Sequence, residues 1–246
     1  MLRLVTIPIS HYCEKARWAL ARAGIPYREE RHVQGVHYFA SKRAGGHGTT
    51  PVLVTPDGAI GESEKILAWV DEHMPAERRL FPEDGPQRDE VLKLSRRLDA
   101  DLGPRGRRLL YVNMLAEREL TLRFNNNGVP RWEDRAMRLG FPLAARWVGK
   151  ELGIRPGIEV EDEEVVWREF DFVAGLLSDG RPHLCGDRFT AADLTFGALS
   201  ASVIVPPVYG TPLPQPDVLP AHIAALVHRA REHPAGRYAL SLYDRR

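Results

Sequence analysis

The chain has 246 residues, of which 43% are hydrophobic and 27% charged, and its formal net charge is +1 at pH 7. Basic and acidic residues balance on both sides of residue 75, with 9 and 8 before it and 25 and 25 after it. This composition is typical of a globular protein with ample core, and it offers neither a basic surface for nucleic acid nor an apolar run that could span a bilayer.

The two cysteines, Cys13 and Cys185, cannot form the disulfide framework of a small secreted protein. The N-terminus leads directly into a strand pattern and does not resemble a signal peptide. The nine histidines are scattered, and no spacing of Cys or His suits a metal ion. We therefore expect a cytoplasmic protein in a reducing setting, without a metal cofactor.

The first 74 residues alternate strand and helix patterns. They predict a strand over residues 2–7, a helix over 14–23 and a second strand over 27–33. An irregular segment with a short helix follows over 35–48. A strand over 51–55 is then joined by a Pro-Asp-Gly turn to a strand through Ile60, and a helix begins at Ser63. This βαβ, ββα order predicts a small α/β domain over residues 1–74.

The pattern changes after residue 74. Residues 75–86 are rich in proline and are predicted to be a linker, and residues 87–246 are predicted to form an all-helical domain. Its expected helical segments are 86–122, interrupted at Gly103-Pro104, and 132–152, 160–178, 190–204 and 218–232. Residues 205–220 hold six prolines and form a loop of a length that is often functional.

The segment Ser10-His11-Tyr12-Cys13 has the spacing of a Cys-x-x-Cys redox motif with serine in the first position. It lies where the first strand gives way to the first helix, and free N–H groups at a helix start stabilise negative charge and acidify a thiol. The substitution removes dithiol chemistry and leaves a hydroxyl that can hold the thiolate of another molecule.

Four motifs, in this order, resemble the cytosolic glutathione S-transferase superfamily, in a bacterial type with serine at the catalytic position. They are Ser10-His11-Tyr12-Cys13-Glu14-Lys15-Ala16-Arg17, Thr50-Pro51-Val52-Leu53, Glu62-Ser63 at a helix start, and Gly186-Asp187-Arg188-Phe189-Thr190-Ala191-Ala192-Asp193. The resemblance covers the whole chain. It implies a thioredoxin-like domain followed by an all-helical one, glutathione as co-substrate, a homodimer and a role in detoxification.

The resemblance also implies site residues. Ser10 would donate its hydroxyl hydrogen to the glutathione sulfur, and lowering the thiol pKa from about 8.5 to about 6.5 corresponds to roughly 2.7 kcal/mol. Pro51 would be cis and would present the backbone of Thr50 to the cysteinyl part of glutathione. Ser63 would bind the γ-glutamyl carboxylate at a helix start, and Glu62 the α-amino group.

The subsite for the glycyl carboxylate departs from the usual family pattern, and Lys42, Arg43 and His47 are its candidates. Cys13 is expected to be a small core residue, with reactive-thiol chemistry as the alternative. Tyr12 is a second candidate donor to the glutathione sulfur, but we expect it instead to shape the site or the edge of the dimer interface. We expect His11 to be exposed and without a role, and Cys185 to lie in the core.

The second substrate, a small electrophilic or hydrophobic molecule, is expected between the two domains. Helix 86–122 and loop 205–220 would supply its pocket, with candidate aromatic residues Tyr111, Trp132, Phe141 and Tyr209, although each suits a core as well. Arg105, Arg107 and Arg108 form a basic run whose default interpretation is a solvated face, with an anionic substrate or a dimer contact as alternatives.

Three functions follow. The first is a glutathione transferase in which Ser10 activates the thiol for attack on an electrophilic carbon. The second is a glutathione-dependent thiol reductase or dehalogenase that uses Cys13. The third is a non-catalytic glutathione-binding module, and the unusual glycyl subsite also leaves open that glutathione is not bound.

Overall fold

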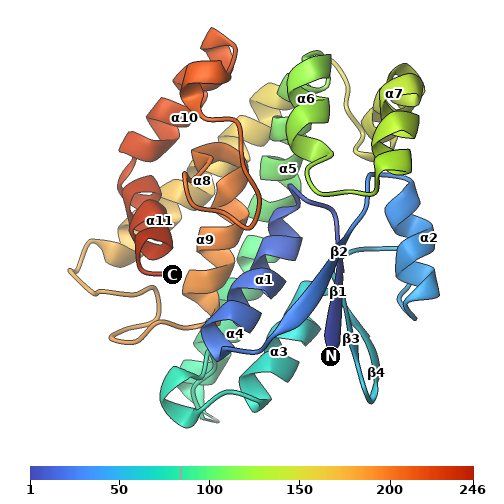
Figure 1. Cartoon of the computed structure of the whole chain (residues 1–246). Coiled ribbons are helices and arrows are strands. Elements are labelled where there is room, and N and C mark those ends of the chain that lie inside the picture. The colour runs from blue at the N-terminus through green and yellow to red at the C-terminus, as the bar shows by residue number, and fades with distance from the viewer. Residues whose placement is uncertain (84) are drawn as a thin grey trace.

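The computed structural model describes residues 1–83 and 85–246, and it confirms the predicted fold class (Figure 1). The N-terminal part contains a four-stranded sheet and three helices: β1 Leu2–Thr6, α1 His11–Ala23, β2 Tyr27–Arg31, α2 Val36–Arg43, β3 Val52–Thr55, β4 Gly58–Gly61 and α3 Ser63–Glu72. The rest is helical: η1 Ala76–Arg78, α4 Pro86–Ala100, α5 Leu102–Met114, α6 Arg118–Asn125, α7 Arg131–Glu151, α8 Ile158–Leu177, α9 Ala191–Ile204, η2 Pro216–Val218, α10 Ala221–Glu232 and α11 Pro234–Asp244.

The sheet has the order β2-β1-β3-β4, with β1 and β2 parallel and the other two pairs antiparallel. Helices α1 and α3 cover one face and pack against each other, while α2 lies on the other side (Figure 1). Apolar residues of the predicted strands, such as Leu4 and Leu53, are fully buried beneath α1 and α3. This arrangement places the start of α1 and the start of β3 at the same end of the sheet.

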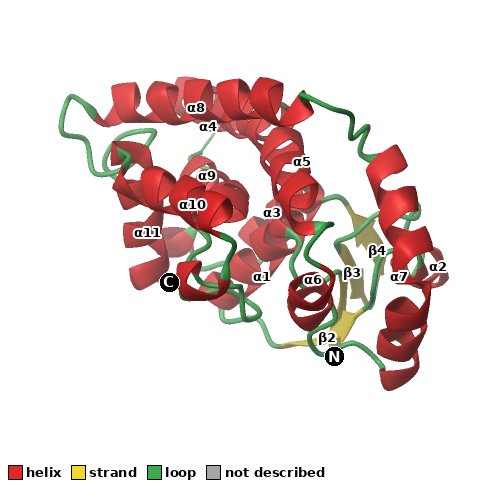
Figure 2. Cartoon of the chain, turned by 90° about the horizontal axis from the view of Figure 1, so that it is seen from above, coloured by secondary structure: helices red, strands yellow, loops and turns green. Residues whose placement is uncertain are grey.

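Helix α9 lies at the centre of the helical part, where all of its residues are buried (Figure 2). It is apolar on every side, as a helix with neighbours all round must be, and it contacts α1, α4, α5, α10 and α11. Helix α9 begins with a capping box, which lies in the fourth motif of the sequence: the Thr190 N–H and hydroxyl both donate to Asp193 Oδ2, at 2.7 and 2.9 Å. Contact between α1 and α9 joins the α/β part to the helical part.

Two features differ from the sequence prediction. The segment predicted as one helix over 86–122 forms α4, α5 and most of α6, and the first break lies at Asp101 rather than at Gly103-Pro104. Pro104 is tolerated because the first turn of a helix has no use for its missing N–H. Helix α11 was not predicted, although Ala235, Ala239 and Leu242 on its buried face recur at helical spacing. Position 84 of the predicted linker lies outside the described residues.

Gly103 allows α5 to approach Tyr12 of the Ser10–Cys13 segment closely. A Cβ atom at this position would lie 2.2 Å from the Tyr12 hydroxyl oxygen. We therefore expect Gly103→Ala to lower the free energy of unfolding by about 1–3 kcal/mol, the usual cost of overpacking. Urea-induced unfolding of the variant and the parent protein measures the difference.

The matched control is Gly140→Ala in α7, where nothing lies within 4 Å of the added Cβ atom. Alanine is a better helix former than glycine at such a site, so the free energy of unfolding of this variant should rise by about 0.5–1 kcal/mol. Equal effects of the two substitutions would contradict the proposed close approach of α5 to Tyr12.

Candidate active site

Ser10 lies at the N-terminus of α1, directly after the loop that follows β1. It is the N-cap residue, and its side-chain oxygen accepts a hydrogen bond from the Cys13 N–H at 3.3 Å. That bond uses an acceptor position of the hydroxyl, so its hydrogen can still be donated. The Cys13 sulfur is one acceptor within reach, because hydrogen bonds from Ser10 and Thr50 both tend to lower the pKa of that thiol. The free N–H groups of the first turn add positive electrostatic potential at the same point.

Ser10 opens onto a cavity of about 140 Å³ between the sheet end and α5. The cavity is lined by Ile7, Ile9, Ser10, His11, Tyr12, His37, Thr49, Thr50, Arg107, Leu110 and Tyr111. Of the residues nominated from the sequence as catalytic or glutathione-binding, Ser10, Tyr12 and Thr50 therefore come together here. His37 and Thr49 were not nominated, and Arg107 was interpreted by default as part of a solvated face.

The Thr50–Pro51 peptide bond is cis, as predicted. The backbone N–H and carbonyl of Thr50 have no hydrogen-bond partner among the described residues. Strands β3 and β4 pair with Val52 opposite Gly61. Continuing that register places Glu62 and Ser63 beside Pro51 and Thr50, so these four predicted residues occupy one end of the β3–β4 hairpin.

Glu62 has an unusual backbone, with φ 65° and ψ 130°, at the N-cap position of α3. A residue other than glycine in this region is strained, and such strain is concentrated at functional sites. The Glu62 carboxylate is exposed and pairs with Lys65 at 2.9 Å, whereas Ser63 is buried in the first turn of α3. An exposed acid beside a buried helix start suits a ligand that carries both an amine and a carboxylate.

Neither the Cys13 thiol nor the Tyr12 hydroxyl is available to a ligand, because the first is buried and the second is hydrogen-bonded within the protein. Cys13 is fully buried, and burial raises the pKa of its thiol although the charge of Arg17 opposes this. Tyr12 donates its hydroxyl hydrogen to the Asp99 carbonyl at 3.0 Å, and burial together with the Asp99 carboxylate raises its pKa to about 12. Only the ring of Tyr12 is left to shape the cavity.

The expectation for His11 was wrong, because the side chain is 3% exposed. The Ser10–Cys13 segment turns into the interface with α5, so the second motif position faces protein rather than solvent. Burial, with the charges of Arg107 and Lys15, lowers the pKa of His11 to about 3. Its Nε2 atom is buried and has no hydrogen-bond partner among the described residues.

The candidates for the glycyl subsite lie outside the cavity. Lys42, Arg43 and His47 are exposed, and the Lys42 ammonium lies 4.3 Å from the centre of the Tyr38 ring. His37 lines the cavity instead. Its Nδ1 accepts from the Gly35 N–H at 3.1 Å, so Nε2 carries the proton in the neutral ring and can donate it to a ligand.

The proline-rich loop 205–220 packs over the segment that carries Ser10. Tyr209 donates its hydroxyl hydrogen to the Ile9 carbonyl at 3.2 Å, and Thr211 donates to the Pro8 carbonyl at 3.3 Å. The Gly210 N–H donates to the buried carboxylate of Glu14 at 3.1 Å. These contacts fix the backbone just before Ser10 from the helical side of the molecule.

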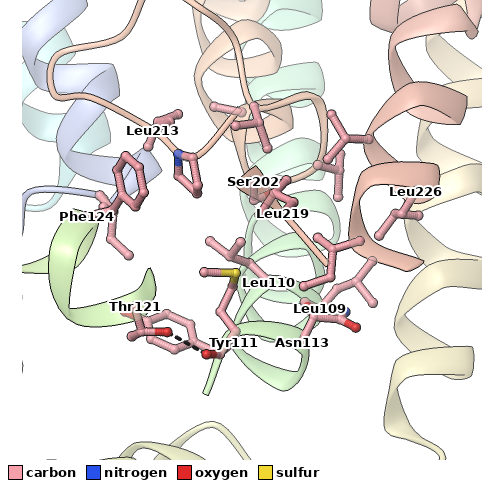
Figure 3. A pocket seen from close by; sticks show the side chains of 18 of the residues that line it. Leu109, Leu110, Tyr111, Asn113, Thr121, Phe124, Ser202, Leu213, Leu219 and Leu226 are labelled. Atoms are coloured by element: carbon pink, nitrogen blue, oxygen red, sulfur yellow. Dashed lines mark hydrogen bonds between the residues drawn. The ribbon is translucent and has the colours of Figure 1, made fainter. Parts of the chain in front are cut away.

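A second, apolar cavity of about 50 Å³ adjoins the first. Side chains from α5, α6, α9, loop 205–220 and α10 converge on it (Figure 3), and it shares Ile9, Leu110 and Tyr111 with the Ser10 cavity. Of the four aromatic candidates for the second-substrate pocket, Tyr111 and Tyr209 line it. Trp132 is 62% exposed and lies apart from it, and Phe141 packs in a small core with Val33 and Leu122.

Two further observations concern cofactors and membranes. Within residues 1–83 and 85–246, no group of three or more His, Cys, Asp and Glu side chains is placed to hold a metal ion. None of the helices that the structure describes is long and apolar enough to cross a membrane.

Residues 4–78 match the family model of the glutathione S-transferase N-terminal domain. Solved structures match along nearly the whole chain. The glutathione S-transferase from Xanthobacter autotrophicus Py2 is 18% identical, with a TM-score of 0.59 over 98% of this chain and 92% of that chain. The chain has the glutathione S-transferase fold.

Other glutathione S-transferases agree with this assignment of the fold. The enzyme from Methylobacterium radiotolerans JCM 2831, solved in complex with glutathione sulfonate, is 22% identical, with a TM-score of 0.55 over 97% of this chain and 94% of that chain. Glutathione transferase F2 from Populus trichocarpa is 14% identical, with a TM-score of 0.61 over all of both chains. No curated protein sequence matches the chain. At these identities the likeness establishes the fold and leaves the reaction to the site itself.

Proposed function

We propose that this protein is a glutathione transferase in which Ser10 stabilises the glutathione thiolate for attack on an electrophilic carbon. One observation carries the proposal: Ser10, whose hydroxyl can donate its hydrogen at a helix N-terminus, lines the same cavity as Thr50, whose backbone groups have no hydrogen-bond partner among the described residues. A strand-like pairing with Thr50 would bring the glutathione sulfur toward Ser10.

The remaining contacts follow from the proposed orientation. Ser63 and the first turn of α3 would bind the γ-glutamyl carboxylate, and Glu62 would bind the α-amino group. His37 would donate to the glycyl carboxylate. In the reaction the thiol proton passes to solvent, the sulfur forms a bond to carbon, and the leaving group departs with its electron pair. The apolar cavity beside Tyr111 would hold the body of the second substrate.

A homodimer, a cytoplasmic location and a role in detoxification belong to the same proposal. The reductase alternative has less support, because a fully buried thiol with a raised pKa is a poor nucleophile.

Cys13→Ala separates the two reactions. If Ser10 activates glutathione, this variant keeps kcat for conjugation of chlorodinitrobenzene within about twofold, since truncating one small core side chain acts on stability rather than on the site. Conjugation is measured by the absorbance of the product, and reduction of a glutathione mixed disulfide is measured in a parallel assay of the same variant.

The proposal is supported if the parent protein catalyses conjugation and Cys13→Ala retains this activity. Loss of both activities in the variant, with its folded state intact by circular dichroism, would assign the chemistry to Cys13. Glutathione binding in calorimetry without turnover of any electrophile would instead indicate a binding module.

A further inference from the structure

Arg107 gives the Ser10 cavity its charge. Among the described residues that line this cavity, Arg107 alone is charged at neutral pH, because the lining contains no carboxylate and burial keeps both histidines, His11 and His37, neutral. The Arg107 guanidinium carbon lies 6.0 Å from the centre of the Tyr12 ring, on the helical side of the cavity opposite the β3 end. A second substrate would enter from this side.

The neighbouring arginines of the same run are occupied. Arg108 forms a two-pronged ion pair with Asp162 at 2.6 and 2.7 Å, and Arg105 donates to the Ala100 carbonyl at 3.3 Å. In the part of the chain that the structure describes, Arg107 has no ion pair, and its Nε atom is buried without a hydrogen-bond partner. Arg105 and Arg108 therefore have structural partners, whereas Arg107 faces the Ser10 cavity.

Unpaired buried polar atoms gather at this cavity. Among the described residues, five buried side-chain polar atoms have no partner, and two of them, His11 Nε2 and Arg107 Nε, belong to residues that line it. Buried polar groups in folded proteins are nearly always hydrogen-bonded, so a pair of unpaired ones in one cavity indicates a place that a ligand completes.

The geometry of the guanidinium defines the ligand group. The Nε–H and one Nη–H of arginine point in parallel and bind both oxygens of a carboxylate side-on. The adjoining apolar cavity shares Ile9, Leu110 and Tyr111 with the Ser10 cavity, so one molecule can place an apolar part there while its carboxylate stays near Arg107.

We propose that Arg107 selects second substrates that carry a carboxylate on a compact apolar body. The inference rests on the proposed transferase function, since it places the electrophilic carbon of that substrate beside the thiolate at Ser10. With an aryl chloride, the sulfur forms the new bond to the ring carbon and chloride leaves with the electrons of the carbon–chlorine bond.

The test compares chlorodinitrobenzoate with its primary amide, which differs only in charge at the group that would meet Arg107. The quantity measured is the ratio of kcat/KM for the carboxylate to kcat/KM for the amide, in which the intrinsic reactivities cancel between variants. We expect Arg107→Gln to lower this ratio about tenfold, the contribution of a modest charge-assisted hydrogen bond. Arg107→Lys keeps the positive charge but loses the two parallel N–H donors, so its ratio should lie between that of Arg107→Gln and that of the parent protein.

Arg105→Gln is the matched control, because this arginine lies on the same helix outside the cavity, and its ratio should equal that of the parent protein. A ratio that stays unchanged in Arg107→Gln, with both rates falling together, would overturn the proposal and assign Arg107 to glutathione itself.

Calorimetry separates this inference from the proposed function. If neither electrophile is turned over by the parent protein, the transferase proposal fails, and binding of dinitrobenzoate against its amide still tests Arg107. Carboxylate preference that disappears in Arg107→Gln supports the inference, and equal binding of the two compounds by the parent protein refutes it.

Discussion

Ser10→Ala is expected to lower kcat for conjugation of chlorodinitrobenzene by about 10- to 100-fold at pH 6.5, because a hydrogen bond to a charged group contributes about 1.5–3 kcal/mol. Losing that bond raises the pKa of bound glutathione by about one to two pH units. The remaining thiolate is somewhat more nucleophilic, which offsets part of the loss. The deficit should therefore shrink as the pH rises toward 9, and kcat measured across this range would show the shift directly.

Ser10 also caps α1, so the substitution needs controls that separate the hydroxyl from the helix start. Ser10→Gly keeps most of the capping stability, losing only a few tenths of a kcal/mol, yet has no hydroxyl. Ser10→Thr keeps both. We expect the glycine variant to be as slow as the alanine variant and the threonine variant to keep the parent pH profile. A loss of rate that is the same at every pH would exclude Ser10 from thiol activation.

The elements that the sequence predicts well are those set by local pattern. Short apolar runs such as residues 2–7 and 51–55 indicated strands, and the first helix ends at Ala23 as expected, with Gly24 as its C-cap. Helix α11 was missed although its buried residues, among them Ala235, Ala239 and Leu242, recur at helical spacing, because small residues such as alanine are a weak signal of a buried face. Their burial depends on the helix packing against α8, α9 and α10, which is tertiary information.

The site divides along the same line. Ser10 and Pro51 could be nominated because each is tied to a local feature, a helix start or a strand start. Arg107 and His37 are brought to the cavity by α5 and α2, helices whose placement no local pattern specifies. Among three nearby arginines, only the partner of each decides its role, and Asp162, the partner of Arg108, lies 54 positions further along the chain.

Arg17→Met is expected to lower the free energy of unfolding by about 3–5 kcal/mol at pH 7, as breaking a buried ion pair does. The Arg17 side chain is 2% exposed and donates to Glu29 at 2.8 Å and to Glu14 at 3.2 Å. It also donates to the Ile7 carbonyl at 3.4 Å, in the loop that leads to Ser10. Methionine fills a similar volume and leaves two carboxylates without this partner. Urea-induced unfolding measures the loss.

The pH dependence distinguishes a lost charge from lost packing. Burial tends to raise the pKa of Glu29, but the charge of Arg17 and hydrogen bonds from Arg31 and Thr6 outweigh it and hold that pKa below its ordinary value. A carboxylate of this kind stabilises the fold above its unfolded pKa, and this stabilisation disappears as the pH falls through its folded pKa. The difference between Arg17→Met and the parent protein should therefore narrow below about pH 4.3, the ordinary glutamate pKa.

Arg3→Met is the matched control for this charge effect. Arg3 pairs with Glu30 at 3.1 Å between strands β1 and β2, but the two side chains are 43% and 25% exposed. A solvent-screened pair contributes less than about 1 kcal/mol, so this variant should lose little at any pH. Equal losses of stability for both variants, or a loss for Arg17→Met that does not change with pH, would show that the charge of Arg17 is not the source of its stabilisation.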